Sequence, residues 1–313
     1  MNPSQPQNEA NMKLAASRQR SKNRDSKEKA IEFVLFMAAL SSVLTTLGII
    51  GVLVFESVAF FQKVSIVEFL TGTEWTPLFD NPKYGILPLV SGTVVTTLVA
   101  LALAIPLGTI AAIYLSEYAP FRLREIVKPL LELLSAVPTV VYGYFALTFV
   151  TPLLQNFLPD LPGFNMLSAG LVIGIMIIPY ISSLSEDAMR AVPMSIREGS
   201  YAMGATRMQT ALRVILPAAF SGITAGYILG ISRAIGETMI VAIAAGLQPN
   251  LTFNPTEPAA TITAYIVQVS LGDIPYGSIA YETIFAAGLT LLLMTLVFNI
   301  LGYFLRKRFR EIY

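Results

Sequence analysis

Residues 218–247 decide the fold class, and they read AAFSGITAGYILGISRAIGETMIVAIAAGL. A membrane-spanning helix needs roughly 20 apolar residues to cross about 30 Å of hydrocarbon, and this stretch is long enough. It nevertheless carries two charges near its middle, Arg233 and Glu237. Such charges are rare in spanning helices, because inserting an arginine at the centre of the helix costs about 2.5 to 3.5 kcal/mol on experimental insertion scales. Where they occur, they usually mark a substrate or ion pathway. We therefore expect the function to involve Arg233 and Glu237.

The composition of the whole chain supports a membrane protein. Hydrophobic residues make up 54% of the sequence, charged residues only 13%, and the mean hydropathy is +0.65. A soluble domain of this length would be far more polar. The chain has no Cys and no His, which excludes disulfides, thiol chemistry, His-ligated metal sites and His-based proton transfer. We expect no metal site.

Six segments are long and apolar enough to span a bilayer, although the fourth is the shortest. They are Ile31–Phe55, Leu87–Leu115, Pro129–Val150, Ser168–Leu184, Ala218–Leu247 and Thr283–Leu305. We therefore predict an all-α polytopic membrane protein with about six transmembrane helices.

The charge distribution predicts the orientation and the domains. Short loops rich in Lys and Arg face the cytoplasm. The basic residues after the second and fourth spans place those loops, and with them both termini, on the cytoplasmic side of the cell (inner) membrane: Arg122, Arg124, Lys128, Arg190, Arg197, Arg207 and Arg213. Residues 1–30 lack apolar periodicity and are predicted to be a disordered basic arm. Residues 31–313 then form one multi-pass transmembrane domain.

The fifth segment has a face of small residues that also carries its charges. On an ideal helix, Gly222, Gly226 and Gly230 form one stripe, and Arg233 and Glu237 project within the same sector. Glycines at every fourth position let helices approach closely, so this face should point into the bundle or a cavity and not toward lipid. Two interpretations stay open. Arg233 and Glu237 form a structural salt bridge, or Arg233 presents its guanidinium to an oxyanion in transit while Glu237 orients it.

Residues 185–217, between the fourth and fifth spans, are the most polar internal segment. Glu198, Gly199 and Ser200 are followed by Gly204 and, after nine residues, by Val-Ile-Leu-Pro ending at Pro217. We predict a helix ending near Gly204 and a second, short helix from about Arg207. This spacing resembles the signature of the permease subunits of binding-protein-dependent ABC importers: Glu-Ala-Ala, three residues, Gly, nine residues, Ile, one residue and Leu-Pro. Gly-Ser here replaces Ala-Ala, and Val replaces Ile.

The resemblance implies a type I (MetI-like) importer fold and a coupling role for this loop, which in that family docks onto a separate ATPase subunit. The coupling-loop candidates are Arg197, Glu198, Gly199, Ser200, Gly204 and Ala205. The alternative is a surface hairpin whose charges merely keep it out of the lipid. The chain contains no Gly-x-x-x-x-Gly-Lys-Ser/Thr motif, so we expect no cofactor in it and ATP-Mg to be bound by a partner ATPase.

Further motifs resemble the PstC-type permeases of phosphate importers. They are RAIGETM at 233–239, YGILPLVSGT at 84–93 and LSEYAP at 115–120. PstA-type permeases continue Glu-Thr-Ala-Pro where this chain has Glu-Thr-Met, and sulfate and molybdate permeases follow Arg-Ala-x-Gly-Glu with Phe-Gly. The phosphate assignment follows from this resemblance and not from helix geometry.

The third span supplies a second part of the expected pathway. Pro138 should free a backbone carbonyl near the bundle interior, and Thr139 and Tyr142 can line a polar path, although a proline kink needed only for packing explains the same residues. Together, the candidate pathway residues are Arg233, Glu237, Ser232, Thr238, Pro138 and Thr139.

The resemblance implies several partners and leaves other function classes to weigh. It implies a second, PstA-like permease subunit, a cytoplasmic ABC ATPase dimer and an extracytoplasmic phosphate-binding protein, all around a lipid bilayer and without nucleic acid. The alternatives are a permease for another oxyanion of the sulfate or molybdate type, and a stand-alone secondary anion carrier, although no inverted repeat is visible. An intramembrane enzyme fits poorly, because His and Cys are absent and no aspartate pair lies within the spans.

Overall fold

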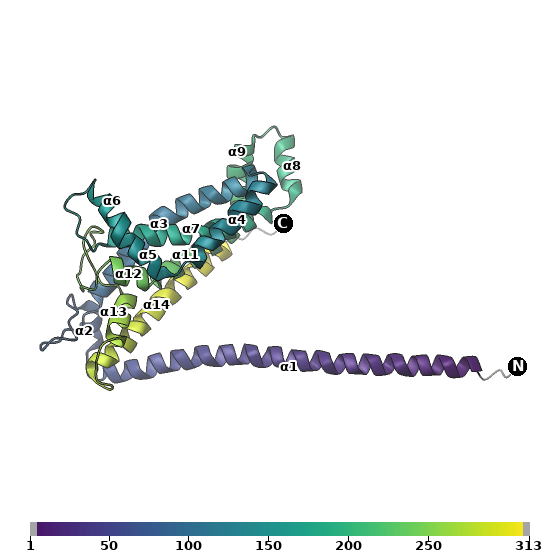
Figure 1. The fold of residues 1–313 in the computed structure, drawn as a ribbon, viewed down its shortest axis with the longest axis horizontal. Helices are drawn as coiled ribbons and strands as arrows, with labels where there is room; N and C mark the ends of the chain where they lie inside the picture. The colour runs from purple at the N-terminus through teal and green to yellow at the C-terminus, as the bar shows by residue number, and fades with distance from the viewer. Residues whose placement is uncertain (1–4, 309–313) are drawn as a thin grey trace. The chain divides into compact units, whose positions relative to one another are not determined.

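A computed structural model of the chain describes the backbone of residues 5–308 and the side-chain surroundings of residues 28–308 (Figure 1). The described residues are helical apart from loops and one isolated bridge between Trp75 and Tyr84. The α-helices are α1 (Gln5–Phe61), α2 (Ile66–Thr71), α3 (Leu87–Ile113), α4 (Phe121–Ala136), α5 (Thr139–Phe145), α6 (Thr151–Gln155), α7 (Met166–Arg190), α8 (Met194–Ala202), α9 (Arg207–Thr210), α10 (Leu216–Ala218), α11 (Phe220–Ile235), α12 (Met239–Ala244), α13 (Ile262–Ser270) and α14 (Ile279–Arg308). Three π-helical turns join them: η1 (Tyr114–Tyr118), η2 (Ala146–Val150) and η3 (Ala211–Ile215).

The chain divides into two units, Met1–Phe55 and Glu56–Tyr313. The described part of the first unit is helix α1, whose backbone is helical from Gln5 onward, so residues 5–30 differ from the disordered arm expected from composition. The sequence explains the helix, because it has no Gly or Pro between residues 7 and 47 and is rich in good helix formers. Residues 1–4 of the expected arm lie outside the described residues.

Four helices of the described chain are long and apolar enough to cross a membrane, and six spans result if each of two bent pairs counts as one. This agrees with the predicted number of about six. The four are Glu28–Phe61 within α1, Leu87–Tyr118, Met166–Arg190 and Ile279–Arg308.

The third and fifth spans are broken, and the break in the third lies where Pro138 was expected to interrupt the backbone ladder. The third bends by 87° between α4 and α5, where Pro138 lacks the N–H that would continue the ladder. The fifth bends by 73° before α11 and breaks again after Ile235, where Gly236 and Glu237 separate α11 from α12. Residues 218–247 are therefore two helices joined by a turn.

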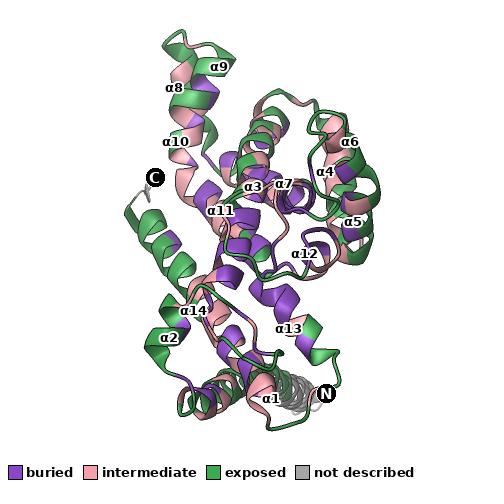
Figure 2. Ribbon diagram, turned by 90° about the vertical axis from the view of Figure 1, so that its left-hand side faces the viewer, coloured by how far each residue is buried: buried purple, intermediate pink, exposed green. Residues whose placement is uncertain are grey.

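Helix α7 forms the centre of the second unit. In its most apolar window 61% of the residues are buried, against 11% for α14, and Figure 2 shows much of α7 as buried. Glycines allow this packing: a methyl group on Gly170 would lie 2.7 Å from Val99 of α3, and one on Gly174 would lie 2.8 Å from the Ala100 carbonyl. The predicted fourth span, the shortest of the six, is thus the most buried of the four unbroken ones.

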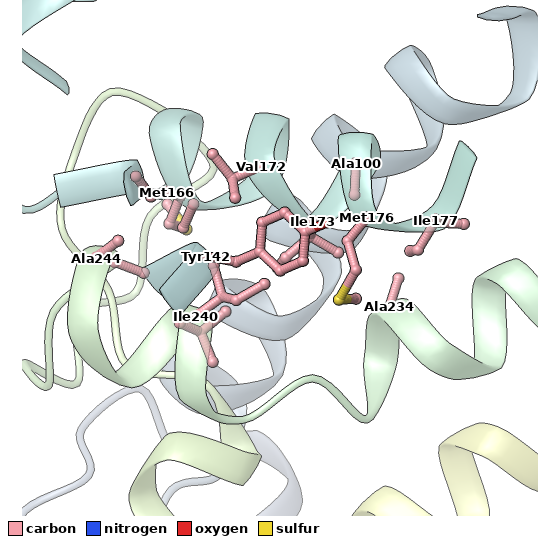
Figure 3. Close-up of a cluster of buried hydrophobic side chains, with 14 of the residues drawn as sticks. Ala100, Tyr142, Met166, Val172, Ile173, Met176, Ile177, Ala234, Ile240 and Ala244 are labelled. Atoms are coloured by element: carbon pink, nitrogen blue, oxygen red, sulfur yellow. The ribbon is translucent and has the colours of Figure 1, made fainter. Parts of the chain in front are cut away.

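Tyr142 of α5 and Ala234 of α11 contribute to the hydrophobic cluster around α7 (Figure 3). Its other members include Ile173 and Met176 of α7 and Ile240 of α12. This cluster fixes the two broken spans against α7, so both breaks have defined positions in the bundle.

The two ends of the bundle carry different elements. Helices α8 and α9 lie at one end, and α2, α6 and α13 at the other (Figure 1). At the α13 end, Trp75 lies between Phe69 and Tyr265, with ring centroids 6.1 and 5.1 Å apart, in edge-to-face geometry. Tyr265 also hydrogen-bonds to Thr283 of α14 at 2.6 Å. Helix α13 is therefore part of the packed bundle.

Candidate functional site

The glycine stripe of α11 packs directly onto α7. A methyl group added to Gly222 would lie 2.5 Å from the Cβ of Ala188, and one added to Gly226 would lie 3.3 Å from the Cβ of Leu184. At Gly230 the nearest atom belongs to Ile177, at 3.1 Å. The prediction that this face points into the bundle is confirmed, and the close approach holds α11 at a fixed position on α7.

Arg233 lies at the edge of this contact and is exposed in the isolated chain. Its guanidinium carbon lies 4.5 Å from the centroid of the Tyr180 ring, a cation–π geometry. Among the residues that the structure describes, no carboxylate forms an ion pair with Arg233. The ring occupies one face of the guanidinium and leaves its N–H donors, which lie in the guanidinium plane, available for an oxyanion.

Glu237 has a different partner from the one expected. Its side chain is buried, with the residue 8% exposed, and Oε1 accepts hydrogen bonds from the N–H groups of Met239 at 3.1 Å and Ile240 at 3.3 Å. It thus caps the N-terminus of α12, where backbone N–H groups lack helical partners. The salt bridge with Arg233, one of the two interpretations left open, does not form in the described chain, because the turn at Gly236 takes Glu237 off the helix that carries Arg233.

The polar neighbours of these two residues point elsewhere. Ser232 donates to the side-chain oxygen of Asn299 on α14 at 3.2 Å, and Thr238 donates to the Gly236 carbonyl at 3.2 Å. Thr263 of α13 donates to the Glu237 carbonyl at 2.7 Å. Ser232 therefore joins α11 to α14, whereas Thr238 and Thr263 hold the turn between α11 and α12.

The break between α4 and α5 comes close to Arg233 through Tyr180. The Tyr142 hydroxyl donates to the Leu134 carbonyl at 2.7 Å, and the Tyr180 hydroxyl donates to the Ser135 carbonyl at 3.5 Å. Both carbonyls belong to the last turn of α4, which Pro138 prevents from continuing. The structure thus brings Arg233, Tyr180 and the α4 end together, while Pro138 and the half-buried Thr139 lie just beyond.

Sequence reasoning missed Tyr180. It follows Pro179 within the predicted fourth span, where a tyrosine does not stand out from the apolar residues around it. An aromatic ring with a polar tip near an intramembrane arginine in a neighbouring span is the only signal, and it requires knowing which helices are adjacent.

The predicted coupling loop has the local structure expected from its sequence. Helix α8 ends at Ala202, and Gly204 has φ +82°, a left-handed conformation that favours glycine after a helix. The N–H of Ala205 returns to the Ser200 carbonyl at 3.2 Å. Thr206 then caps α9 in a capping box with Gln209. The predictions of a helix ending near Gly204 and a second one from about Arg207 are confirmed.

One face of α8 and the turn after it are open to solvent in the isolated chain. Glu198, Gly199 and Gly204 are exposed, and the Met203 side chain is exposed to 88%. A methyl group added to either glycine would meet no atom within 4 Å. This combination of small residues, a carboxylate and an exposed methionine leaves room for another protein to approach the backbone of α8.

Arg197 points the opposite way, into the bundle. One guanidinium nitrogen lies 2.6 Å from both carboxylate oxygens of Glu117, and the other donates to the Met189 carbonyl at 2.7 Å. The two side chains are only 12% and 5% exposed. Of the coupling-loop candidates, Arg197 is therefore an internal contact and not part of the exposed face.

A second group of charges lies beside it, around Glu186 of α7. This carboxylate is fully buried and has Lys128 at 2.9 Å, Arg190 at 3.4 Å and Arg124 at 3.5 Å. Lys128 also contacts Asp187 at 2.6 Å. Composition alone placed Glu186 in a polar loop, but α7 continues to Arg190 and carries the carboxylate into the bundle.

The sequence matches a family of known transport proteins. Residues 104–311 match the family model for the binding-protein-dependent transport system inner membrane component. A probable ABC transporter permease protein, YqgH of Bacillus subtilis, is 38% identical over 275 residues, which cover 88% of this chain and 87% of YqgH. The phosphate transport system permease protein PstC of Mesorhizobium japonicum is 32% identical over 292 residues, covering 86% of this chain and 88% of PstC.

Solved structures show the same fold. A chain of a bacterial ABC transporter involved in the import of the acidic polysaccharide alginate superposes with a TM-score of 0.63 and 18% identity, covering 92% of this chain and 100% of that chain. A chain of the MetNI methionine ABC transporter in an inward-facing conformation gives a TM-score of 0.53 and 18% identity over 72% of this chain and 95% of the other. At this identity the likeness concerns the fold alone.

Proposed function

Because the chain belongs to the family of inner membrane components of binding-protein-dependent transport systems, we propose that it is the permease subunit of an ATP-driven importer of inorganic phosphate. It forms half of the translocation pathway and works by alternating access. The phosphate assignment is supported by PstC relatives from several organisms, including Xylella fastidiosa at 36% identity over 64% of this chain. Transport, and not catalysis, is the activity of this chain.

The observation that carries the site assignment is the unpaired guanidinium of Arg233. Its charge is fixed, since an arginine does not lose its proton in proteins, and its planar donors match two oxygens of a tetrahedral oxyanion. Tyr180 holds it by the ring face at 4.5 Å without using those donors. Phosphate crossing the membrane would meet Arg233 next to the α4 end, where Pro138 and Thr139 line the path.

Three partners complete the transporter in this proposal. A second, PstA-like permease subunit supplies the other half of the pathway, and an extracytoplasmic phosphate-binding protein delivers the anion. A cytoplasmic ABC ATPase dimer binds ATP-Mg, for which this chain has no phosphate-binding loop. The family description, which names a binding-protein-dependent system, supports the delivery of substrate by a binding protein.

The exposed face of α8 is the surface on which the ATPase docks. Glu198 supplies a charge, and Gly199 and Gly204 leave the backbone accessible. In this proposal the α8 end of the bundle and both termini face the cytoplasm. The basic residues gathered at that end, Arg190, Arg207 and Arg213 among them, agree with the positive-inside rule.

Substituting Arg233 tests the proposal. Arg233→Gln should lower the rate of phosphate uptake at least a hundredfold, because a lost charge-assisted contact costs about 3 kcal/mol. Assembly with the ATPase should be unchanged, because Arg233 makes no ion pair in the described chain. Uptake of radiolabelled phosphate into proteoliposomes loaded with ATP, together with copurification of the ATPase, measures both. Normal uptake by the variant would remove Arg233 from the pathway.

Competition identifies the anion. Excess arsenate should suppress phosphate uptake, whereas sulfate and molybdate should not. Inhibition by sulfate or molybdate in preference to arsenate would assign the chain to another oxyanion importer. Uptake by the chain alone, with no ATPase present, would instead show a stand-alone carrier.

A further inference from the structure

Two adjacent residues of α8 face opposite environments. Glu198 is exposed and, among the described residues, forms no ion pair, whereas the Arg197 side chain is only 12% exposed and lies against the bundle. If α8 docks onto an ATPase, Arg197 lies on the far side of the helix from the ATPase. Its contacts therefore bear on how a movement of α8 is passed to the membrane helices after docking.

Arg197 ties α8 to both central helices of the bundle. Glu117 lies in η1, which continues α3 without a break, and Met189 lies in the last turn of α7. Helices α3 and α7 are packed through glycines too tightly to slide independently. A displacement of α8 is thus passed to this pair through two contacts of 2.6 and 2.7 Å that share one guanidinium.

The η1 turn that holds Glu117 also contacts α4, which leads to the proposed pathway. Arg124 of α4 donates to the Leu115 carbonyl at 2.9 and 2.6 Å, one residue away from Ser116, whose hydroxyl donates to Glu117 at 2.7 Å. At its other end, α4 accepts the Tyr180 hydrogen bond beside Arg233. Polar contacts at both ends of α4, joined by the helix itself, thus link α8 and η1 to the candidate anion site.

We propose that Arg197 is the positioning residue that converts movement of α8 into movement of the membrane helices, through its paired contacts with Glu117 and the Met189 carbonyl. This inference rests on the proposed function. Other contacts keep α8 folded when Arg197 is replaced: Ile196 packs against the apolar cluster that includes Met189, and Ser200 bonds Thr210 at 2.9 Å. Loss of Arg197 therefore loosens transmission without removing the docking face.

The experiment measures phosphate transported per ATP hydrolysed by the whole complex in proteoliposomes. Arg197→Gln and Glu117→Gln should each lower this ratio about five- to tenfold, the lower end of the range of typical coupling free energies. The ATPase should still copurify and hydrolyse ATP. The double variant should be no worse than either single variant, because both remove the same contact. Arg122→Gln, an exposed arginine of α4 without a partner among the described residues, should leave the ratio unchanged.

The reversed pair, Arg197→Glu with Glu117→Arg, distinguishes transmission from docking. Partial recovery of the ratio supports the inference even if the single variants assemble poorly, since the recovered contact lies inside this chain. Loss of the ATPase that the reversed pair does not restore would assign Arg197 to docking and overturn the inference, as would an unchanged ratio in both single variants. A wild-type chain that binds no ATPase would instead overturn the proposed function.

Discussion

Two charged residues within the bundle, Glu186 and Arg233, have opposite surroundings although both lie against α7. Glu186 belongs to α7, is fully buried and has three cationic neighbours within 3.5 Å. Arg233 packs on α7 from α11, is exposed in the isolated chain and rests on an aromatic ring. The charge of Glu186 is neutralised by cations around it, whereas Arg233, the proposed anion contact, is held without using its hydrogen-bond donors.

The difference also explains why each charge is tolerated in an apolar chain. A buried carboxylate is stable only when cations and donors surround it, and removing it leaves those cations uncompensated. A guanidinium on a ring loses little of its capacity for hydrogen bonding, because the cation–π contact acts on its face. Substitutions at the two sites should therefore separate stability from transport.

The largest expected effect is on stability, at Glu186. Glu186→Ala should cost about 3 kcal/mol, the lower end of the range for a buried ion pair, since Lys128 and Arg190 are partly exposed and can be rehydrated. The thermal midpoint of the purified chain in detergent should fall by roughly 5 to 10 °C. Asp187→Ala is the matched control: this carboxylate is 56% exposed and should change the midpoint little. Equal shifts for both variants would show that burial of Glu186 does not matter.

The predictions that held and those that failed differ in the kind of information they need. Hydropathy located the spans, and Gly204 and Thr206 marked the ends of α8 and α9, because these signals are local. The interruption at Pro138 was expected, because proline lacks a backbone donor, but the break at Gly236 was not, since glycine also occurs in continuous transmembrane helices.

The partners of single side chains were hardest to predict. Arg233 and Glu237 are four residues apart, which suggested a salt bridge. Because of the turn at Gly236, Arg233 instead contacts the Tyr180 ring, and Glu237 caps α12. Arg197 was grouped with Glu198 as a coupling-loop candidate, but its side chain contacts Glu117 and the Met189 carbonyl inside the bundle. For Glu186 a signal existed: the buried positions Ser182 and Ser185 continue with helical spacing to Glu186 and Met189, so α7 could have been extended beyond Leu184.

The next effect is on transport, at Tyr180. Tyr180→Leu removes the ring under Arg233 and should lower the uptake rate about two- to fivefold, since an exposed cation–π contact is worth about 0.5 to 1 kcal/mol. Tyr180→Phe keeps the ring, loses only the 3.5 Å hydrogen bond to the Ser135 carbonyl, and should keep most of the activity. Uptake of labelled phosphate at saturating binding protein measures both. If Phe were as inactive as Leu, the hydroxyl and not the ring would be the functional group.

The smallest expected effect distinguishes a cap from a charge partner, at Glu237. In Glu237→Gln the amide oxygen can still accept from the N–H groups of Met239 and Ile240, so uptake should fall less than about threefold, a loss below 1 kcal/mol. Glu237→Ala leaves the start of α12 uncapped and should cost about 1 kcal/mol of stability together with a larger loss of uptake. If Gln were as inactive as Arg233→Gln, the negative charge itself would be required. Arg233 and Glu237 would then pair in another state of the transport cycle, and Arg233 would resemble Glu186 in depending on an opposite charge.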